Sequence, residues 1–230
     1  MEKNGSQFVL PGASDRTVII GQTGSGKTIQ GAWLLSKQRF DKRPWVALDY
    51  KQEELWDRVG DPPMRPLKMG AMPAKRGLYC LSVRPDQDEE LEDWLWKIWE
   101  RGNVGLFVDE VSLVKSKAAF KGILRQGRSK QIPVIACTQR PVDCDREVFT
   151  EAQYRSFFGL EDSRDYLTIR GLFGDRDIKE EARSLQRHHS LWYDVKQRSL
   201  MRLRPCPAPA TVAADLKRAA PVTWESALFR

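Results

Sequence analysis

The chain has 230 residues, a formal net charge of +7, a hydrophobic content of 41% and a mean hydropathy of −0.53. This length suits a single domain with a sizeable core, and without a run of 18 apolar residues we expect no transmembrane helix. The four cysteines form no C-x-x-C pair and the two histidines are adjacent, so we expect neither a zinc site nor a disulfide framework. The positive charge is compatible with a polyanionic partner but is weak support by itself.

A glycine-rich segment follows the first predicted strand, at 17–20. Residues 21–28, GQTGSGKT, fit the pattern G-x-x-x-x-G-K-[ST] at every fixed position, and a helical pattern follows. Strand, glycine loop and helix are the context in which backbone N–H groups cradle phosphates. Lys27 would bridge the β- and γ-phosphates of ATP, and the Thr28 hydroxyl would bind Mg²⁺. The predicted nucleotide-binding residues are Gly21, Gln22, Thr23, Gly24, Ser25, Gly26, Lys27 and Thr28.

Strand and helix patterns alternate through the rest of the chain. Further strands are predicted at 45–48, 78–83, 104–108, 132–138 and 156–160. Helices are predicted at 51–59, 86–101, 113–126 and 143–151, with a helix in two pieces over 162–186. Proline-rich, basic residues at 61–77 indicate an irregular loop. Because the strands are apolar throughout, we expect an α/β fold with a mostly parallel sheet covered by helices on both faces.

The C-terminal region departs from this alternation. Residues 191–195 and 200–204, separated by KQRS, indicate a β-hairpin. PCPAPA at 205–210 is typical of a linker, and a helical pattern follows at 211–220. We therefore predict one P-loop ATPase domain over 1–205 and a C-terminal tail, in part helical, over 206–230.

Polar residues follow two of the buried strands, where open α/β sheets bind their ligands. Asp109 comes directly after the strand at 104–108 and matches the acid that holds Mg²⁺. Glu110 is the natural general base for an attacking water, which favours hydrolysis over transfer to a second substrate. Gln139 ends the next strand, where its amide would contact the γ-phosphate and the lytic water. An acidic turn and a surface glutamine are the alternative interpretations.

Arginines lie between the Glu110 strand and the Gln139 strand. Arg125, Arg128 or Arg140 would serve as an arginine finger that reaches the γ-phosphate of a neighbouring subunit, or would be a solvated or DNA-facing side chain. Arg128 is our first choice because, of the two arginines that precede the Gln139 strand, it lies closer to that strand.

Three motifs together resemble the FtsK/HerA group of ring-forming ATPases: DYKQE at 49–53, VDE at 108–110 and ACTQRP at 136–141. The likeness covers roughly residues 15–165, and the short chain resembles the genome-packaging ATPases of tailless, internal-membrane double-stranded DNA viruses of the tectivirus type. This resemblance implies a RecA/ASCE-like fold with the Gln139 strand between the phosphate-loop strand and the Glu110 strand. It also implies a homo-oligomeric ring, a pentamer or hexamer, that threads double-stranded DNA and takes an arginine in trans.

The same resemblance implies where such a motor would work. We expect the host cytoplasm, in association with the virion or procapsid vertex, and a capsid vertex protein or membrane-associated viral protein as partner. Between Val111 and Lys130 there are six basic residues and no acid, and we predict that Lys115, Lys117 and Lys121 contact the DNA backbone. A solvated basic face and the basic residues of 65–76 are the alternatives.

Two other functions stay open at this point. A filamentous-phage-type assembly ATPase would share the fold but usually carries a membrane-spanning segment. A P-loop small-molecule kinase would be expected to show an arginine-rich lid and no Asp-Glu plus Gln combination. An ATP-driven translocase of double-stranded DNA is the function that the motifs favour.

Overall fold

The computed structural model describes residues 8–60, 63–115 and 118–220. A nine-stranded sheet runs through its centre in the order β3-β4-β2-β5-β6-β1-β7-β8-β9. The strands are β1 (Arg16–Ile20), β2 (Pro44–Asp49), β3 (Met64–Leu67), β4 (Gly77–Ser82), β5 (Gly105–Val108), β6 (Val134–Thr138), β7 (Tyr154–Phe157), β8 (Ser190–Asp194) and β9 (Ser199–Leu203). The pairs from β3 to β7 are all parallel, which confirms the predicted fold class.

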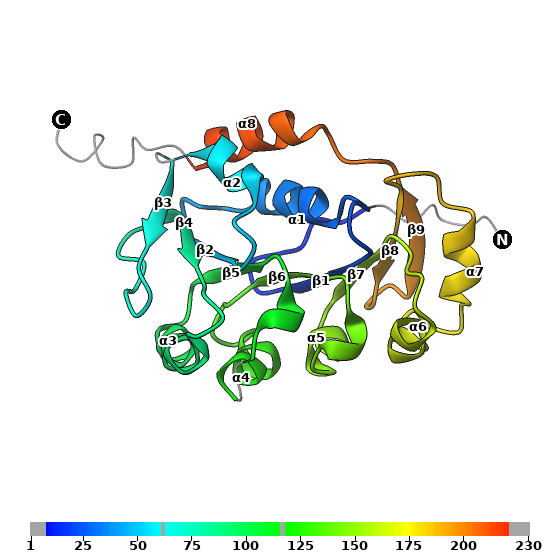
Figure 1. Ribbon diagram of the computed structural model, residues 1–230, viewed down its shortest axis with the longest axis horizontal. Coiled ribbons are helices and arrows are strands. Elements are labelled where there is room, and N and C mark those ends of the chain that lie inside the picture. Colours follow the sequence, from blue (N-terminus) through cyan, green and yellow to red (C-terminus); the bar gives the residue numbers. More distant parts are fainter. Residues whose placement is uncertain (1–7, 61–62, 116–117, 221–230) are drawn as a thin grey trace.

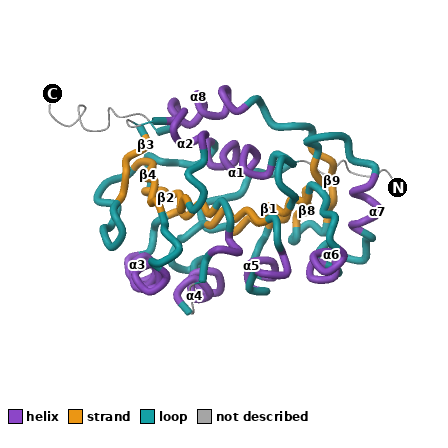
Figure 2. Tube along the Cα trace, in the orientation of Figure 1, coloured by secondary structure: helices purple, strands orange, loops and turns teal. Residues whose placement is uncertain are grey.

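Helices cover both faces of the sheet. They are α1 (Lys27–Ser36), α2 (Glu54–Val59), α3 (Asp88–Arg101), α4 (Ala119–Gln126), α5 (Glu147–Thr150), α6 (Ser163–Ile169), α7 (Ile178–Arg183) and α8 (Pro209–Ala219), with 3₁₀ turns η1 (Val111–Leu113) and η2 (Pro141–Asp143). Figure 1 shows α1, α2 and α8 on one face and α3, α4, α5 and α6 on the other, and Figure 2 shows the strands as the layer between them.

The handedness of strand connections explains this division. The chain moves in one direction across the sheet from β1 to β2 and on to β3, and α1 and α2 lie on those connections. It moves in the opposite direction from β4 through β5 and β6 to β7, and α3, α4 and α5 lie on those. Because parallel crossovers are right-handed, reversing the direction places the helices on the opposite face. The reversal leaves the carboxyl ends of β1, β5 and β6 side by side, with β6 in the middle as predicted.

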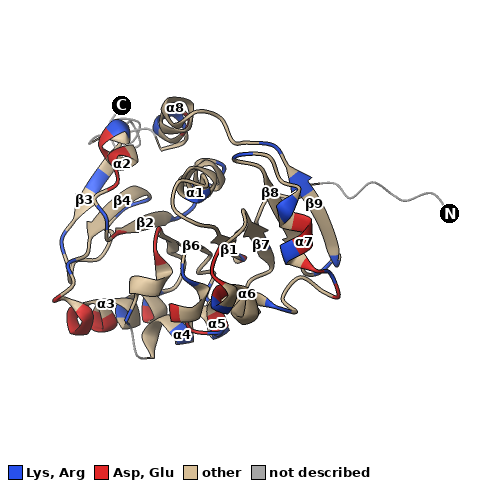
Figure 3. Cartoon of the chain, turned by 45° about the vertical axis from the view of Figure 1, so that its right-hand side comes forward, with Lys and Arg blue, Asp and Glu red and all other residues tan. Residues whose placement is uncertain are grey.

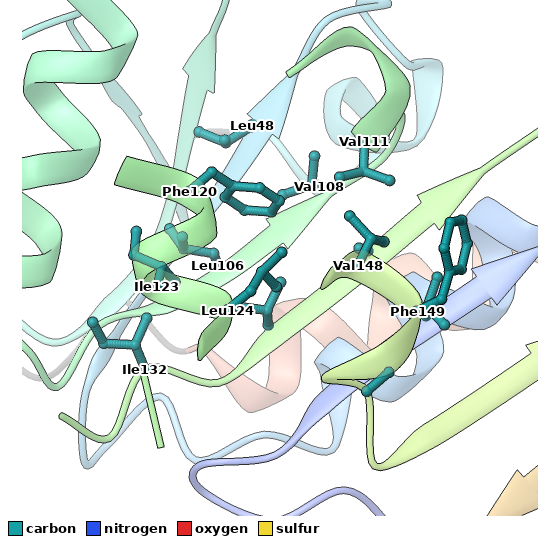
Figure 4. Close-up of a cluster of buried hydrophobic side chains, with 14 of the residues drawn as sticks. Leu48, Leu106, Val108, Val111, Phe120, Ile123, Leu124, Ile132, Val148 and Phe149 are labelled. Carbon is teal, nitrogen blue, oxygen red and sulfur yellow. The ribbon is translucent and has the colours of Figure 1, made fainter. Parts of the chain in front are cut away.

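The core on the α3–α5 side is built from apolar strands and from helices with one apolar face. Figure 4 shows Phe120, Ile123 and Leu124 of α4 pointing toward Leu106 and Val108 of β5. The three α4 side chains recur at helical spacing, so they lie on one face and are buried. This layer holds the Glu110 strand firmly against its neighbours.

The predicted C-terminal hairpin is present and extends the sheet. Strand β8 pairs antiparallel with both β7 and β9. After it, α8 packs against α1 and α2 through Val212, Ala213 and Leu216, which are buried. None of the helices in the described part of the chain combines the length and apolar character needed to cross a lipid bilayer.

The sequence predicted an irregular loop over 61–77, but part of this segment is a strand. Met64–Leu67 forms β3, which pairs parallel with β4 and places Pro66 opposite Cys80. A proline removes one backbone donor, which a strand tolerates at the edge of a sheet, where one side has no partner strand. The prolines and basic residues that suggested a loop therefore belong in part to an edge strand.

The predicted helix over 113–126 is shorter than expected. The turn η1 and the helix α4 are separate elements, α4 begins only at Ala119, and Lys115 lies between them. We expected Lys117 and Lys121 to share one helix face, but Lys117 lies outside the described residues. Only Lys121 of the three predicted DNA-binding lysines is placed on a described helix.

Candidate active site at the carboxyl edge of the sheet

The glycine loop connects the end of β1 to the start of α1. Gly24 and Gly26 have φ values of +75° and +101°, in the left-handed region that favours glycine. A Cβ atom added to Gly21 would come within 2.8 Å of the Phe158 Cβ, so that position also has no room for a side chain. No side chain of the described residues caps α1, so its first N–H groups are available to an anion.

The loop forms one wall of a cavity of about 620 Å³. Lys27 lies in the first turn of α1 and is buried, and Thr28 lines the cavity beside it. Thr23, Gly24 and Gly26 also line it, which places five of the eight predicted nucleotide-binding residues on its surface. Cavities of this size are typical of small-molecule and cofactor sites.

Asp109 lies directly after β5 and is fully buried. Both of its carboxylate oxygens lack a hydrogen-bond partner among the described residues. Lys51 Nζ lies 3.6 Å from its Oδ2, beyond hydrogen-bond distance, and a buried carboxylate without a hydrogen-bond donor fits the position of a Mg²⁺ ligand. Over the same residues there is no cluster of three or more His, Cys, Asp or Glu side chains that could hold a metal. A cation here would therefore rely on Asp109, Thr28 and the phosphates of the nucleotide.

Glu110 is also buried but is well supplied with donors. Its Oε1 accepts hydrogen bonds from the Ser112 hydroxyl at 2.8 Å and from the Gln139 N–H at 3.2 Å, and its Oε2 lies 3.0 Å from Lys51 Nζ. These contacts fix the carboxylate at the edge of the sheet. Glu110 does not itself line the nucleotide cavity but is bonded to Gln139, which does.

Gln139 joins the glycine loop to Glu110. Its side-chain Oε1 accepts a hydrogen bond from the Thr23 hydroxyl at 2.5 Å, while its own N–H donates to Glu110. Gln139 also lines the cavity. One residue therefore contacts both the phosphate loop and the predicted base.

The structure adds Lys51, to which the sequence assigned no role beyond its place in DYKQE. Lys51 Nζ lies 3.6 Å from Asp109 and 3.0 Å from Glu110. The Asp49 carboxylate accepts the N–H groups of Lys51 and Glu53 and so holds the turn that positions them. Burial opposes the charge of Lys51, but the two carboxylates outweigh it and raise its pKa. Burial and the charge of Asp109 raise the pKa of Glu53.

The candidate arginine fingers lie away from the cavity of their own subunit. Arg125 donates a hydrogen bond to Glu147. Arg128 follows α4 and precedes β6, at the amino end of the sheet, near Arg16 at the start of β1. Arg140 lies at the carboxyl end, with its Nε 3.7 Å from both Asp143 and Asp165. None of the three lines the nucleotide cavity as the described residues form it.

Two lysines of the basic run between Val111 and Lys130 form ion pairs with acids in or next to neighbouring helices. Lys121 Nζ lies 2.9 Å from Asp145, and Lys115 Nζ lies 3.8 Å from Asp88 at the start of α3. Figure 3 shows acidic residues at the start of α3. The charged residues of α4 are both basic, and the one charged residue of α5, Glu147, is acidic. The sequence count of six bases and no acid therefore overstates the positive charge of this surface.

Solved structures with a similar fold include a viral genome packaging NTPase. The fold is similar to the genome packaging NTPase B204 of Sulfolobus turreted icosahedral virus 2, with a TM-score of 0.68 and 19% identity over 86% of this chain and 99% of that chain. VirB4 of Thermoanaerobacter pseudethanolicus gives a TM-score of 0.69 and 10% identity over 84% of this chain and 90% of that chain. The chain thus has the fold of the P-loop NTPases.

Sequence comparison identifies the family. No protein-family model matches the chain. It is 33% identical to the DNA packaging ATPase P9 of Enterobacteria phage PRD1 over 214 residues, 89% of this chain and 93% of P9. The chain belongs to the family of P9. The predicted resemblance to viral genome-packaging ATPases is confirmed.

Proposed function

We propose that this chain is an ATP-hydrolysing motor that moves double-stranded DNA into a viral capsid. Membership of the P9 family supports the proposal, because P9 is named as a DNA packaging ATPase. The observation that carries the catalytic part is the buried Glu110 carboxylate, held beside the phosphate loop by Ser112 and Gln139. A carboxylate in this position is suited to take a proton from an attacking water.

In the proposed mechanism, the N–H groups of the glycine loop and Lys27 Nζ bind the β- and γ-phosphates. Mg²⁺ held by Thr28 and Asp109 would neutralise the phosphate charge when bound. Glu110 accepts the proton of the attacking water, and Lys51, 3.0 Å away, holds the carboxylate in place. The lack of a hydrogen-bond donor to Asp109 among the described residues supports its assignment to the metal.

Gln139 is the proposed link between hydrolysis and movement. It bonds to Thr23 in the glycine loop and to Glu110 at the same time. Loss of the γ-phosphate changes the groups around these two contacts, so Gln139 is placed to transmit the change along β6 to the far end of the sheet.

Assembly and partners follow from the positions of the charged residues. We infer a homo-oligomeric ring in which Arg128, at the amino end of the sheet, reaches the nucleotide of a neighbouring subunit; Arg125 is the second choice. Lys115, whose side chain is 65% exposed, is the strongest of the three DNA-contact candidates. Double-stranded DNA would pass through the ring at a procapsid vertex in the host cytoplasm.

Translocation is tested directly with a linear duplex that carries a labelled third strand at a chosen distance from its end. A moving ring displaces the third strand, so we expect release that requires ATP, fails with Glu110→Gln, and shows a delay that grows with distance. Hydrolysis without displacement, together with phosphate transfer to a small acceptor, would replace the motor by a kinase.

A further inference from the structure

An apolar hollow lies beside α1, separate from the nucleotide cavity. It has a volume of about 490 Å³ and is lined by Phe8, Val9, Leu10, Trp33 and Lys37, none of which lines the nucleotide cavity. Val9 and Leu10 are 40% and 43% exposed, although both side chains are hydrophobic. Apolar side chains gathered on one surface, rather than scattered singly, indicate an interaction site. We call these five residues the N-terminal hollow.

Aromatic contacts hold the hollow in place. The centre of the Phe8 ring lies 6.0 Å from that of Trp33 in α1 and 5.2 Å from that of Trp192 in β8. Trp192 is fully buried, so it ties Phe8 to the sheet. Phe8 and Trp33 are themselves only partly buried. The fixed rings therefore present apolar surface whose further burial is favourable.

One segment outside the described residues has the composition to cover this hollow. Residues 221–230, PVTWESALFR, follow α8 and carry four large apolar side chains: Val222, Trp224, Leu228 and Phe229. Residues 1–7, which directly precede the hollow, carry one, Met1. The segments 61–62 and 116–117 carry none. Among these segments, 221–230 therefore gains most from burial in an apolar hollow.

The end of α8 lies close enough for residues 221–230 to reach the hollow. Figure 1 shows α8 beside α1 on the same face of the sheet, and the two helices are in contact. Asp215, near the end of α8, lies 3.2 Å from Lys37 Nζ, which in turn lies 5.8 Å from the centre of the Trp33 ring. Ten extended residues span up to about 33 Å. A tether of this length gives an effective concentration in the millimolar range, so a weak contact is sufficient.

We propose that residues 221–230 bind in the N-terminal hollow of their own chain and cover Val9, Leu10 and Trp33. The bound segment joins the region of Phe8, the helix α1 and the end of α8. Because α1 begins at Lys27, this contact braces the helix that carries the predicted phosphate-binding lysine. The inference stands on the hollow and on the reach of the chain, and it holds whether or not the protein moves DNA.

Disulfide formation between introduced cysteines tests the proximity. Ser226→Cys is combined with Leu10→Cys in the hollow or, as the control, with Arg39→Cys, which is exposed and follows Lys37 closely at the end of α1. Reach alone gives the two pairs similar rates. We expect the Leu10 pair to cross-link at least about tenfold faster and within one chain, because docking raises the local concentration. Non-reducing gels and mass spectrometry of the digested protein identify the product.

Trp224→Ser with Leu228→Ser, added to the Leu10 pair, tests whether apolar contact drives the docking. These changes should lower the rate of the Leu10 pair to that of the Arg39 pair. Equal rates for the two pairs in the unaltered segment would overturn the docking. Cross-linked dimers in place of the product within one chain would overturn the assignment to the same chain and make a second copy the occupant.

Thermal unfolding gives a second test that needs no new cysteine. Trp224→Ser with Leu228→Ser should lower the melting temperature of the otherwise native chain by about 2–4 °C, because the hollow loses its cover. In a chain that already carries Val9→Ser and Leu10→Ser, the same two changes should give little further shift, since the contact is already lost. Shifts that simply add would overturn the proposal.

Discussion

Two lysine–carboxylate contacts of almost equal length lie in very different surroundings. Lys51 Nζ is 3.0 Å from Glu110 at the carboxyl edge of the sheet, and Lys121 Nζ of α4 is 2.9 Å from Asp145 in the segment before α5. The Glu110 side chain is 2% exposed, whereas the Asp145 side chain is 41% exposed. Water screens the second contact more than the first, because the carboxylate of the first is buried, so equal distances carry unequal free energies.

The two contacts represent two regions of the molecule: the carboxyl edge of the sheet, where the predicted catalytic residues lie, and the solvent-exposed surface around α4. At the carboxyl edge, two carboxylates are removed from water, and a lysine that is 28% exposed lies against both. Around α4, Lys115 and Lys121 each have an exposed acid beside them and are free to exchange that partner for another anion. The first arrangement suits catalysis, and the second suits reversible contact with a polyanion.

The largest expected effect comes from removing the cation at the carboxyl edge. Lys51→Met leaves Asp109 and Glu110 buried without a counter-charge, and we expect a loss of about 3 kcal/mol of folding free energy. Lys121→Met, the matched control, breaks a contact of similar length and should cost less than about 1 kcal/mol. Urea unfolding of both variants makes the measurement. Equal losses would show that burial does not distinguish the two contacts.

Two glycines in helices differ in how much room they have for a side chain. A Cβ atom at Gly31 of α1 would lie 2.8 Å from Phe107 and 3.0 Å from Cys137, both fully buried, so Gly31→Ala should destabilise the protein by about 1–2 kcal/mol. At Gly122 of α4 the nearest atom would be 3.7 Å away, in ordinary contact. Gly122→Ala should raise the melting temperature slightly, because alanine favours the helix. A stabilising Gly31→Ala would contradict the close approach of α1 to the sheet.

The outer face is tested by its affinity for DNA. Replacing Lys115, Lys117 and Lys121 by glutamine should weaken binding to duplex DNA and reduce the slope of log affinity against log salt by about 1 to 3, depending on how many contact phosphates. The matched control removes three exposed bases elsewhere: Arg187, Lys196 and Lys217. If both triple variants lost the same affinity, net charge alone would account for binding and the assigned face would be wrong.

The smallest expected effect is a pH dependence at the carboxyl edge. Because burial and Asp109 raise the pKa of Glu53 above its ordinary value of 4.5, the folded protein favours the protonated form. Ionising Glu53 therefore removes stability as the pH rises above about 4.5. Glu53→Gln should have the same melting temperature as the wild type near pH 4 and a higher one at pH 7. If the wild type and Glu53→Gln had the same melting temperature at both pH values, this sign would be contradicted.

The sequence predicted the parts of this site that depend on neighbours along the chain. Apolar runs before Gly21, Asp109 and Gln139 located three strands, and parallel strands bring their carboxyl ends to one edge. The glycine pattern is equally local, because Gly24 and Gly26 are needed for backbone angles within the loop. For these elements the chemistry is carried by residues that directly follow a recognisable pattern.

The remaining features depend on contacts between distant parts of the chain. Lys51 reaches Glu110 across 59 positions, and His188 contacts Ser25 across 163. Nor does the run from Val111 to Lys130 contain the acids that accompany its lysines, since α3 and the segment before α5 provide them. The strand β3 was missed because Pro66 usually signals a loop and only its edge position makes it acceptable.

The central claim is that Glu110 is the base of a DNA-coupled ATPase. The most direct test measures ATP hydrolysis by the wild type and by Glu110→Gln, with and without long double-stranded DNA, alongside ATP binding by both. We predict strong stimulation by DNA in the wild type and a fall in turnover of about 10²- to 10⁴-fold in the variant, with ATP binding retained. Turnover that ignores DNA, or that survives in Glu110→Gln, would contradict the account.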